Sequence, residues 1–287
     1  MEALSHVPQK TASENAVLEH ALRRGVRTVF QPIISLETEA VLGYEALSRG
    51  PSGSELESPE ELFRVAREAA GQVVELDRVC QAAAIRRALD ASLPTHLALF
   101  VNAEPEAARH EVDEPHSDAF AEAGKRGLRL ILEVTERALL NDPAGLLTGA
   151  RRARSAGWGM ALDDVGADTR ALALLPVVEP DVIKLDMALI HNRPDPHTAE
   201  IVHAIAAEAE RRGTNILAEG IETREQLEHA RSLGATLGQG YLFGRPAPLA
   251  HEGADPGRRI PIGGAVHSGR PPTPFQVLSA SRPTRTA

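Results

Sequence analysis

The chain has 287 residues, a length that fits either two domains or one large (β/α) barrel with tails. Hydrophobic residues make up 43% of the sequence and no apolar run approaches the roughly 18 residues of a membrane span, so we expect a globular chain with no membrane span. The formal net charge of −9 argues against broad binding to duplex nucleic acid, which needs a concentrated face of lysine and arginine. The start lacks a secretory signal pattern and Cys80 is the lone cysteine, so we expect a reducing, cytoplasmic location.

Short β-like runs alternate with amphipathic helical segments from about residue 26 to residue 240. Helix starts carry capping signals at Ser58, Asp142, Asp195 and Thr223. Between the helices we expect eight strands, at 26–35, 40–47, 97–102, 128–135, 160–163, 181–184, 215–219 and 236–239. Residues 36–39 are too few for a parallel crossover, so the first two strands should be antiparallel. The pattern predicts an α/β fold, a closed (β/α) barrel with an antiparallel first strand pair.

The two ends of the chain lack this alternation. We expect an unstructured N-terminal tail at 1–18, a barrel domain at 19–246 and a Pro/Gly-rich linker or tail at 247–287. The run 274–278 would suit the start of a further element, as in a fragment of a longer sensor protein.

Polar side chains close most of the predicted strands. An isolated acidic residue after a strand is more often a helix cap or a solvated loop residue. Here the placement repeats in successive units, and the strands of a barrel end on one face, where active sites form. We therefore expect these side chains to gather in one site. In chain order they are Glu45, Asn102, Glu133, Asp163 with Asp164, Lys184 with Asp186, Glu219 with Glu222, and Gln239.

With Glu136 included, eight carboxylates would crowd this face, and Arg49 and Lys184 are the cations in the same motifs. Mutual repulsion would force several carboxylates to take up protons unless further cations bind. No predicted strand ends in His or Cys, so oxygen ligands favour Mg²⁺ or Mn²⁺ over Zn²⁺. The adjacent Asp163 and Asp164 suit a bridge between two ions, an arrangement that recurs in phosphodiester hydrolysis. The residues thus predict a metal-dependent barrel hydrolase acting on a phosphate ester.

The motif Glu45-Ala46-Leu47, followed by Arg49, resembles the signature of EAL-domain cyclic-di-GMP phosphodiesterases. Further motifs of the family follow over residues 19–246, and their order and spacing make the resemblance specific. The match extends through Phe30-Gln31-Pro32-Ile33, Val101-Asn102, Glu133-Val134-Thr135-Glu136, Asp163-Asp164, Lys184-Leu185-Asp186, Ala218-Glu219-Gly220-Ile221-Glu222 and Gln239-Gly240-Tyr241.

The resemblance implies a TIM-like barrel that hydrolyses cyclic di-GMP to linear 5′-pGpG with one or two Mg²⁺ or Mn²⁺ ions. It also implies bacterial second-messenger signalling by a homodimer, with an attached or partner sensory domain. Each matching residue acquires a role. Glu45, Asn102, Glu133 and Asp163 would bind the first metal ion, and Asp163, Asp164 and Glu219 the second. Glu219 would be the general base, and Lys184 would orient the attacking water. Gln31 and Arg49 would contact the substrate, and the substrate-binding shell would be completed by Asp186, Glu222 and Gln239. Glu136 would steady the loop after the Asp pair.

That loop departs from the family pattern. The family usually reads Asp-Asp-Phe-Gly followed by a Gly- and Ser-rich turn, whereas here Asp163-Asp164-Val165-Gly166 continues into Ala167-Asp168-Thr169-Arg170. In the family the loop couples metal binding to the dimer interface, so the change favours slow turnover.

Two functions stay open. Retention of the acidic ligands favours an active phosphodiesterase, and the altered loop favours a catalytically weak EAL domain that acts as a cyclic-di-GMP receptor or signalling module.

Overall fold

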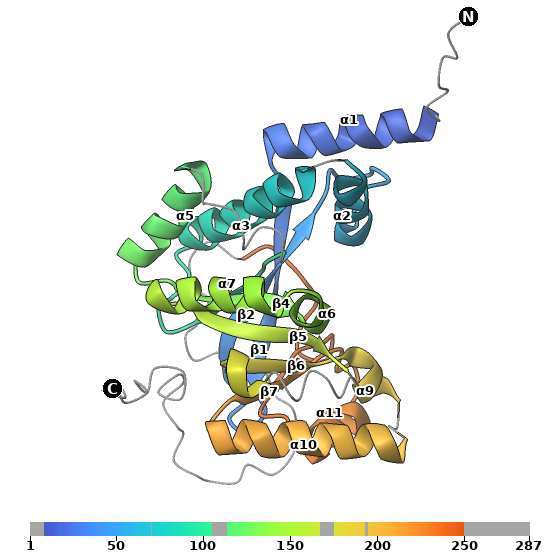
Figure 1. Cartoon of the computed structure of the whole chain (residues 1–287), viewed down its shortest axis with the longest axis vertical. Helices are drawn as coiled ribbons and strands as arrows, with labels where there is room; N and C mark the ends of the chain where they lie inside the picture. The colour runs from blue at the N-terminus through green and yellow to red at the C-terminus, as the bar shows by residue number, and fades with distance from the viewer. Residues whose placement is uncertain (1–8, 70, 105–113, 167–174, 193–194, 250–287) are drawn as a thin grey trace, which may run out of the picture.

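The computed structural model describes residues 9–69, 71–104, 114–166, 175–192 and 195–249 (Figure 1). Eight strands form one closed barrel in sequence order, and the helices lie around it. This confirms the predicted (β/α) barrel, with strand bounds within two residues of those expected. The strands are β1 (Arg27–Ser35), β2 (Val41–Arg49), β3 (Ala98–Asn102), β4 (Arg129–Thr135), β5 (Gly159–Val165), β6 (Val182–Leu185), β7 (Asn215–Ala218) and β8 (Leu237–Gly238).

Strand β1 runs against its neighbours on both sides. It pairs antiparallel with β2, with Gln31 opposite Glu45, and antiparallel with β8, where Ile34 faces Gly238. All other neighbouring strands are parallel. The predicted antiparallel first pair is therefore confirmed. One reversed strand still leaves the C-terminal ends of β2 to β8 on a common face.

Nine helices are described around the barrel, and residues 175–178 are also helical. Thr223 caps α11 through the predicted capping box with Gln226, and Asp195 caps α10 by accepting from the backbone of His197 and Thr198. Ser58 and Asp142 occupy the cap positions of α2 and α7 but make no side-chain cap hydrogen bond. The helices are α1 (Gln9–Arg24), α2 (Pro59–Glu68), α3 (Gln72–Asp90), α5 (Glu114–Lys125), α6 (Glu136–Asn141), α7 (Pro143–Ser155), α9 (Met187–His191), α10 (Pro196–Arg212) and α11 (Arg224–Ser232), with a single helical turn near residues 175–178.

Helix α1 corrects the expected unstructured tail at 1–18, because it begins at Gln9. Its residues Leu18 and Ala21 are fully buried in an apolar cluster with α2 and the start of α3. These helices lie together in the upper part of Figure 1. The first turn of α1 contains no acidic residue, and its buried face shows that tertiary packing stabilises the helix.

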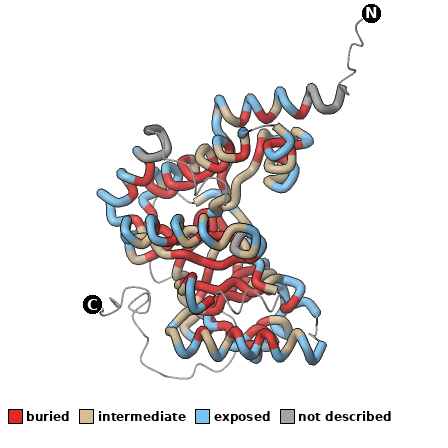
Figure 2. The backbone as a smooth tube through the Cα atoms, in the orientation of Figure 1, coloured by how far each residue is buried: buried red, intermediate tan, exposed pale blue. Residues whose placement is uncertain are grey.

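The barrel interior is filled by one residue from nearly every strand. Side chains alternate across a strand, so the residue two positions before a strand-end polar group points to the same side as that group. Phe100, Ile131, Ala161 and Leu217 are each buried at 3% exposure or less and precede Asn102, Glu133, Asp163 and Glu219 by two positions. An apolar layer thus forms the floor beneath the polar residues. Figure 2 shows that most of the strands and the inner faces of the helices are buried, in red.

The C-terminal end of the described chain returns to the barrel. Ala247 forms an isolated bridge with Phe30 through two backbone hydrogen bonds of 2.7 and 3.0 Å. The expected tail from residue 247 therefore starts with a residue that is bonded to β1. The remainder of the tail, from residue 250, and its run at 274–278 lie outside the described residues. Among the helices that the structure describes, none has the length and apolarity to cross a bilayer.

Candidate active site

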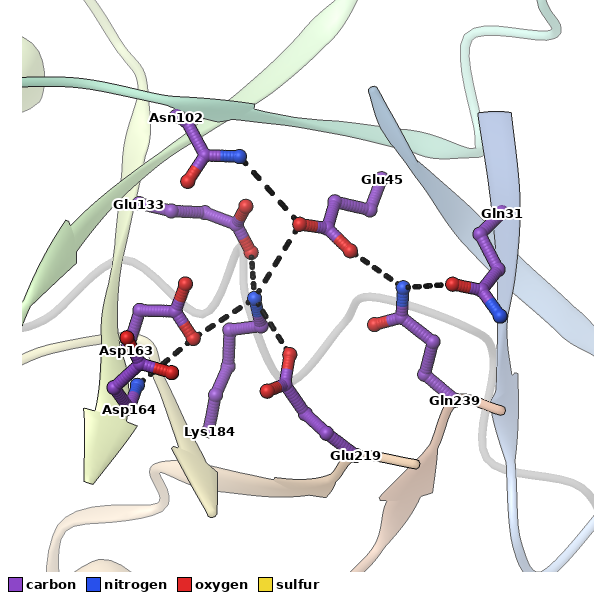
Figure 3. A network of polar contacts seen from close by, with 9 residues as sticks. All are labelled: Gln31, Glu45, Asn102, Glu133, Asp163, Asp164, Lys184, Glu219 and Gln239. Carbon is purple, nitrogen blue, oxygen red and sulfur yellow. Dashed lines mark hydrogen bonds and ion pairs between the residues drawn. The ribbon is translucent and has the colours of Figure 1, made fainter. Parts of the chain in front are cut away.

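Lys184 lies at the centre of a cluster of carboxylates inside the mouth of the barrel (Figure 3). It follows Val182 by two positions on β6, so its side chain rises from the apolar floor and is only 1% exposed. Its Nζ lies 2.8 Å from Glu133 Oε1, 2.9 Å from Asp163 Oδ1, 2.8 Å from Glu219 Oε1 and 3.6 Å from Glu45 Oε1. The expected convergence of strand-end residues is thus observed for four carboxylates and one lysine.

A glutamine, Gln239, holds the second oxygen of Glu45 and links it to Gln31. Gln239 Nε2 donates to Glu45 Oε2 at 2.5 Å and to Gln31 Oε1 at 3.1 Å. Gln31 in turn donates to the carbonyl of Gly244 at 3.1 Å. Asn102 Nδ2 lies 3.5 Å from Glu45 Oε1, at the limit of a hydrogen bond. Figure 3 shows Gln31, Gln239 and Glu45 linked in a row, with Asn102 on the other side of Glu45.

Asp163 and Asp164 end strand β5 in unlike positions. Asp163 is buried and accepts from the backbone N–H of Asp164 at 2.9 Å, whereas Asp164 is exposed. The backbone of Asp164 has φ 54°, a left-handed conformation that aspartate adopts more readily than most residues. This kink turns two consecutive side chains toward Glu219. One oxygen from each of the three carboxylates lies within 4.8 Å of the others, so this group could hold a metal ion.

The charges in the mouth do not balance. One ammonium group faces four carboxylates, and burial raises the pKa of Glu133 well above its usual range and that of Glu219 to about 8. Burial and the neighbouring charge of Asp163 also raise the pKa of Asp164. Burial alone would lower the pKa of Lys184, but the attraction of Glu133 and Glu219 raises it well above its usual range. Lys184 therefore stays protonated while the excess negative charge favours cation binding.

The donor set fits a hard divalent cation. Glu133 Oε2 is buried and has no hydrogen-bond partner among the described residues, which leaves a strong oxygen acceptor aimed into the cluster. The other candidate ligands are carboxylates and the Asn102 amide, with no His or Cys in the group. All-oxygen sites of this kind suit Mg²⁺ or Mn²⁺.

The remaining predicted residues lie outside the network of Figure 3. Arg49 donates to the carbonyl of Ser48 at 2.8 Å, and Asp186 caps α9 by accepting from Ala188 N at 2.6 Å. The exposed Glu222 donates its backbone N–H to Gln226 Oε1 at 2.7 Å. Their expected substrate roles stay predictions.

The loop after the Asp pair is described only in part. Glu136 Oε2 accepts from Gly166 N at 3.1 Å, so this side chain does contact the start of the loop. Val165 is 1% exposed and belongs to β5. The divergent segment 167–170 lies outside the described residues.

Asp77 and Gln81 are buried polar residues that the sequence analysis missed. Both lie on α3 and contact the end of β3. A signal was present, because the two are four residues apart and share a helix face with the buried Val73, Ala84 and Ala88. Polar residues in an otherwise apolar helix stripe are expected to be buried and to have hydrogen-bond partners.

A family model for the EAL domain matches residues 15–246. The chain belongs to the EAL-domain family. Among curated relatives it is similar to the cyclic di-GMP phosphodiesterase NbdA of Pseudomonas aeruginosa, with 32% identity over 83% of this chain and 32% of that protein. The cyclic di-GMP phosphodiesterase RocR of the same organism is 30% identical over 77% of this chain and 57% of that protein. The chain therefore spans between about a third and just over half of the length of these relatives.

A solved structure shares the same EAL fold. It is the manganese and cyclic-di-GMP complex of Klebsiella pneumoniae BlrP1 at pH 9.0, with a TM-score of 0.66 and 31% identity, covering 77% of this chain and 56% of that one. This likeness agrees with the closed barrel described above and confirms the expected family and fold.

Proposed function

We propose that this chain is a metal-dependent phosphodiesterase that hydrolyses cyclic di-GMP to linear 5′-pGpG. The observation that carries the proposal is the cluster in which Lys184 contacts four carboxylates while Asp163, Asp164 and Glu219 lie within 4.8 Å of one another. Related EAL proteins named as cyclic di-GMP phosphodiesterases, and a manganese and cyclic-di-GMP complex of BlrP1, support this choice of substrate and cation.

The residues would divide the metal-binding work between two positions. Glu45, Asn102, Glu133 and Asp163 would hold one Mg²⁺ or Mn²⁺ ion, and Asp163, Asp164 and Glu219 a second. Bound ions would supply Lewis acidity at the phosphate and lower the pKa of water. Gln239 would keep Glu45 turned toward the ion, because it holds the second oxygen of Glu45 and is itself bonded to Gln31.

The reaction would break one phosphodiester bond with water. The 5′-pGpG product would keep a 5′-phosphate, so the water oxygen would attack phosphorus and the bond from phosphorus to O3′ would break. O3′ would take up a proton from solvent and leave as a hydroxyl. Glu219 would accept the proton of the attacking water, and Lys184 would orient that water. The Nζ of Lys184 lies 2.8 Å from Glu219 and 2.9 Å from Asp163. Arg49, Gln31, Asp186, Glu222 and Gln239 would bind the substrate, and Glu136 would steady the loop at Gly166.

Product analysis tests the proposal directly. The protein is incubated with cyclic di-GMP and Mn²⁺, and 5′-pGpG is separated by chromatography. We expect product that disappears with excess chelator and with Glu219→Gln. The matched control is Glu228→Gln, whose side chain is 68% exposed on α11 and pairs with Arg231. Turnover by Glu219→Gln at the control's rate would refute the assigned general base.

A catalytically weak receptor is the second candidate, favoured by the altered sequence at 165–170. This alternative predicts that calorimetry detects binding of cyclic di-GMP while no 5′-pGpG forms in the presence of Mn²⁺.

For either function we also propose a homodimer in the cytoplasm with an attached or partner sensory domain, in bacterial second-messenger signalling. The relatives' greater length agrees with further domains in those proteins.

A further inference from the structure

Asp77 and Gln81 form a buried polar pair behind the active-site strand β3. They are 2% and 5% exposed. Gln81 Nε2 donates to Asp77 Oδ2 at 2.9 Å and to the carbonyl of Asn102 at 3.0 Å. Asp77 Oδ1 accepts from the backbone N–H of Glu104 at 3.1 Å. One helix face thus contacts the backbone on both sides of Ala103.

The same short segment is held from the opposite side by β4. Ala103 N donates to the carbonyl of Glu133 at 2.9 Å, and Asn102 lies in register with Glu133. The backbone of residues 102–104 is therefore fixed by α3 and by β4 together. In contrast, Asn102 is exposed, and among the described residues its side chain has one contact, a long one of 3.5 Å to Glu45. Its direction depends on how firmly its backbone is held.

An apolar pair would pack α3 on β3 without the cost of burying a carboxylate. The next turns of α3 do this with Ala84, Ile85 and Ala88, which lie in one apolar cluster with Leu99 and Val101. The polar pair occurs only at the turn that faces the strand end. This placement favours a role in holding the strand end over a role in general packing.

We propose that Asp77 and Gln81 are positioning residues that hold Asn102 as a metal ligand. The inference rests on the proposed function, because it requires Asn102 to bind the ion. It extends the site to α3, a helix that carries none of the expected ligands.

The test measures Mn²⁺ affinity of the full chain from the free-ion signal in electron paramagnetic resonance. Gln81→Met keeps an unbranched side chain of similar length and removes both hydrogen bonds. We expect it to weaken binding of Mn²⁺ by about 10- to 100-fold, the usual range for residues that orient metal ligands. The matched control is Ile85→Val, a fully buried residue one turn further along α3, which should leave the affinity within about twofold of wild type.

A double-mutant cycle separates positioning from loss of stability. If Gln81 acts through Asn102, Gln81→Met should have no further effect on Mn²⁺ affinity in an Asn102→Ala background. Equal weakening in both backgrounds, or wild-type affinity in Gln81→Met, would overturn the inference. If Gln81→Met does not fold, as judged by circular dichroism, Asp77→Asn is measured in the same cycle. Wild-type protein that binds no Mn²⁺ would instead refute the metal site of the proposed function.

Discussion

Replacing Lys184 with methionine should destabilise the protein strongly, because it removes the one cation at the centre of four carboxylates. Met has similar length and fills the space of the alkyl stem. At a separation of 2.8 Å and an effective dielectric constant of about 20, each close contact corresponds to roughly 6 kcal/mol before desolvation is counted. Loss of hydration offsets much of this, and breaking a buried ion pair typically costs about 3–5 kcal/mol. We expect the free energy of unfolding to fall by about that amount.

The pH dependence of this loss follows from the carboxylates. The pKa of Glu219 is raised to about 8 in the folded protein. Between the ordinary pKa and pH 8, Glu219 is therefore protonated in the folded state and ionised in the unfolded state, so the free energy of unfolding falls as the pH rises. Without Lys184 that pKa rises further. Wild type then stops losing stability above about pH 8 while the variant continues to lose it, so the difference between them should grow from pH 7 to pH 9.

The assay is urea unfolding followed by circular dichroism, with excess chelator, at pH 7 and pH 9. Lys125→Met is the matched control, since Lys125 is 75% exposed and lies 4.0 Å from Glu122. It should change the stability by less than about 0.5 kcal/mol. In a parallel series without chelator, added Mn²⁺ should restore part of the stability of Lys184→Met by binding the folded state. A Lys184→Met variant as stable as the control at both pH values would refute the reasoning.

Three further outcomes are expected. Glu45→Ala should lower turnover by at least about 100-fold with the barrel still folded by circular dichroism, since it removes a proposed metal ligand, whereas wild-type turnover in excess chelator would contradict metal dependence. Val165→Phe combined with a Gly/Ser-rich turn at 167–170 should raise kcat about tenfold, which corresponds to a barrier lower by roughly 1.4 kcal/mol. The affinity for cyclic di-GMP should change less. An unchanged single-turnover rate would show that the sequence of this loop does not slow catalysis. Deleting residues 251–287 should leave the melting temperature nearly unchanged in differential scanning calorimetry, and a drop of several degrees would show that the tail packs on the barrel.

Local patterns in the sequence were enough to predict the architecture and the convergence of several polar side chains on one face of the barrel. Alternation within strands and helix starts such as Thr223 are short-range features, and they imply a closed barrel once eight strands are counted. The rule that parallel strands end on one face then brings Glu45, Glu133, Asp163 and Glu219 together. These inferences need only the order of elements, which the sequence contains.

Tertiary structure alone decided how these side chains contact one another and what holds them. The position of Lys184 between four carboxylates depends on barrel closure and strand register, which set distances between residues up to 174 positions apart. The contact of Gln239 with Glu45 has the same origin, and that of Gln81 with Asn102 depends on the packing of α3 against β3. Helix α1 is likewise stabilised by apolar partners on α2 and α3 rather than by its own sequence signals. Non-local packing sets each of these features, so no window of neighbouring residues could have predicted them.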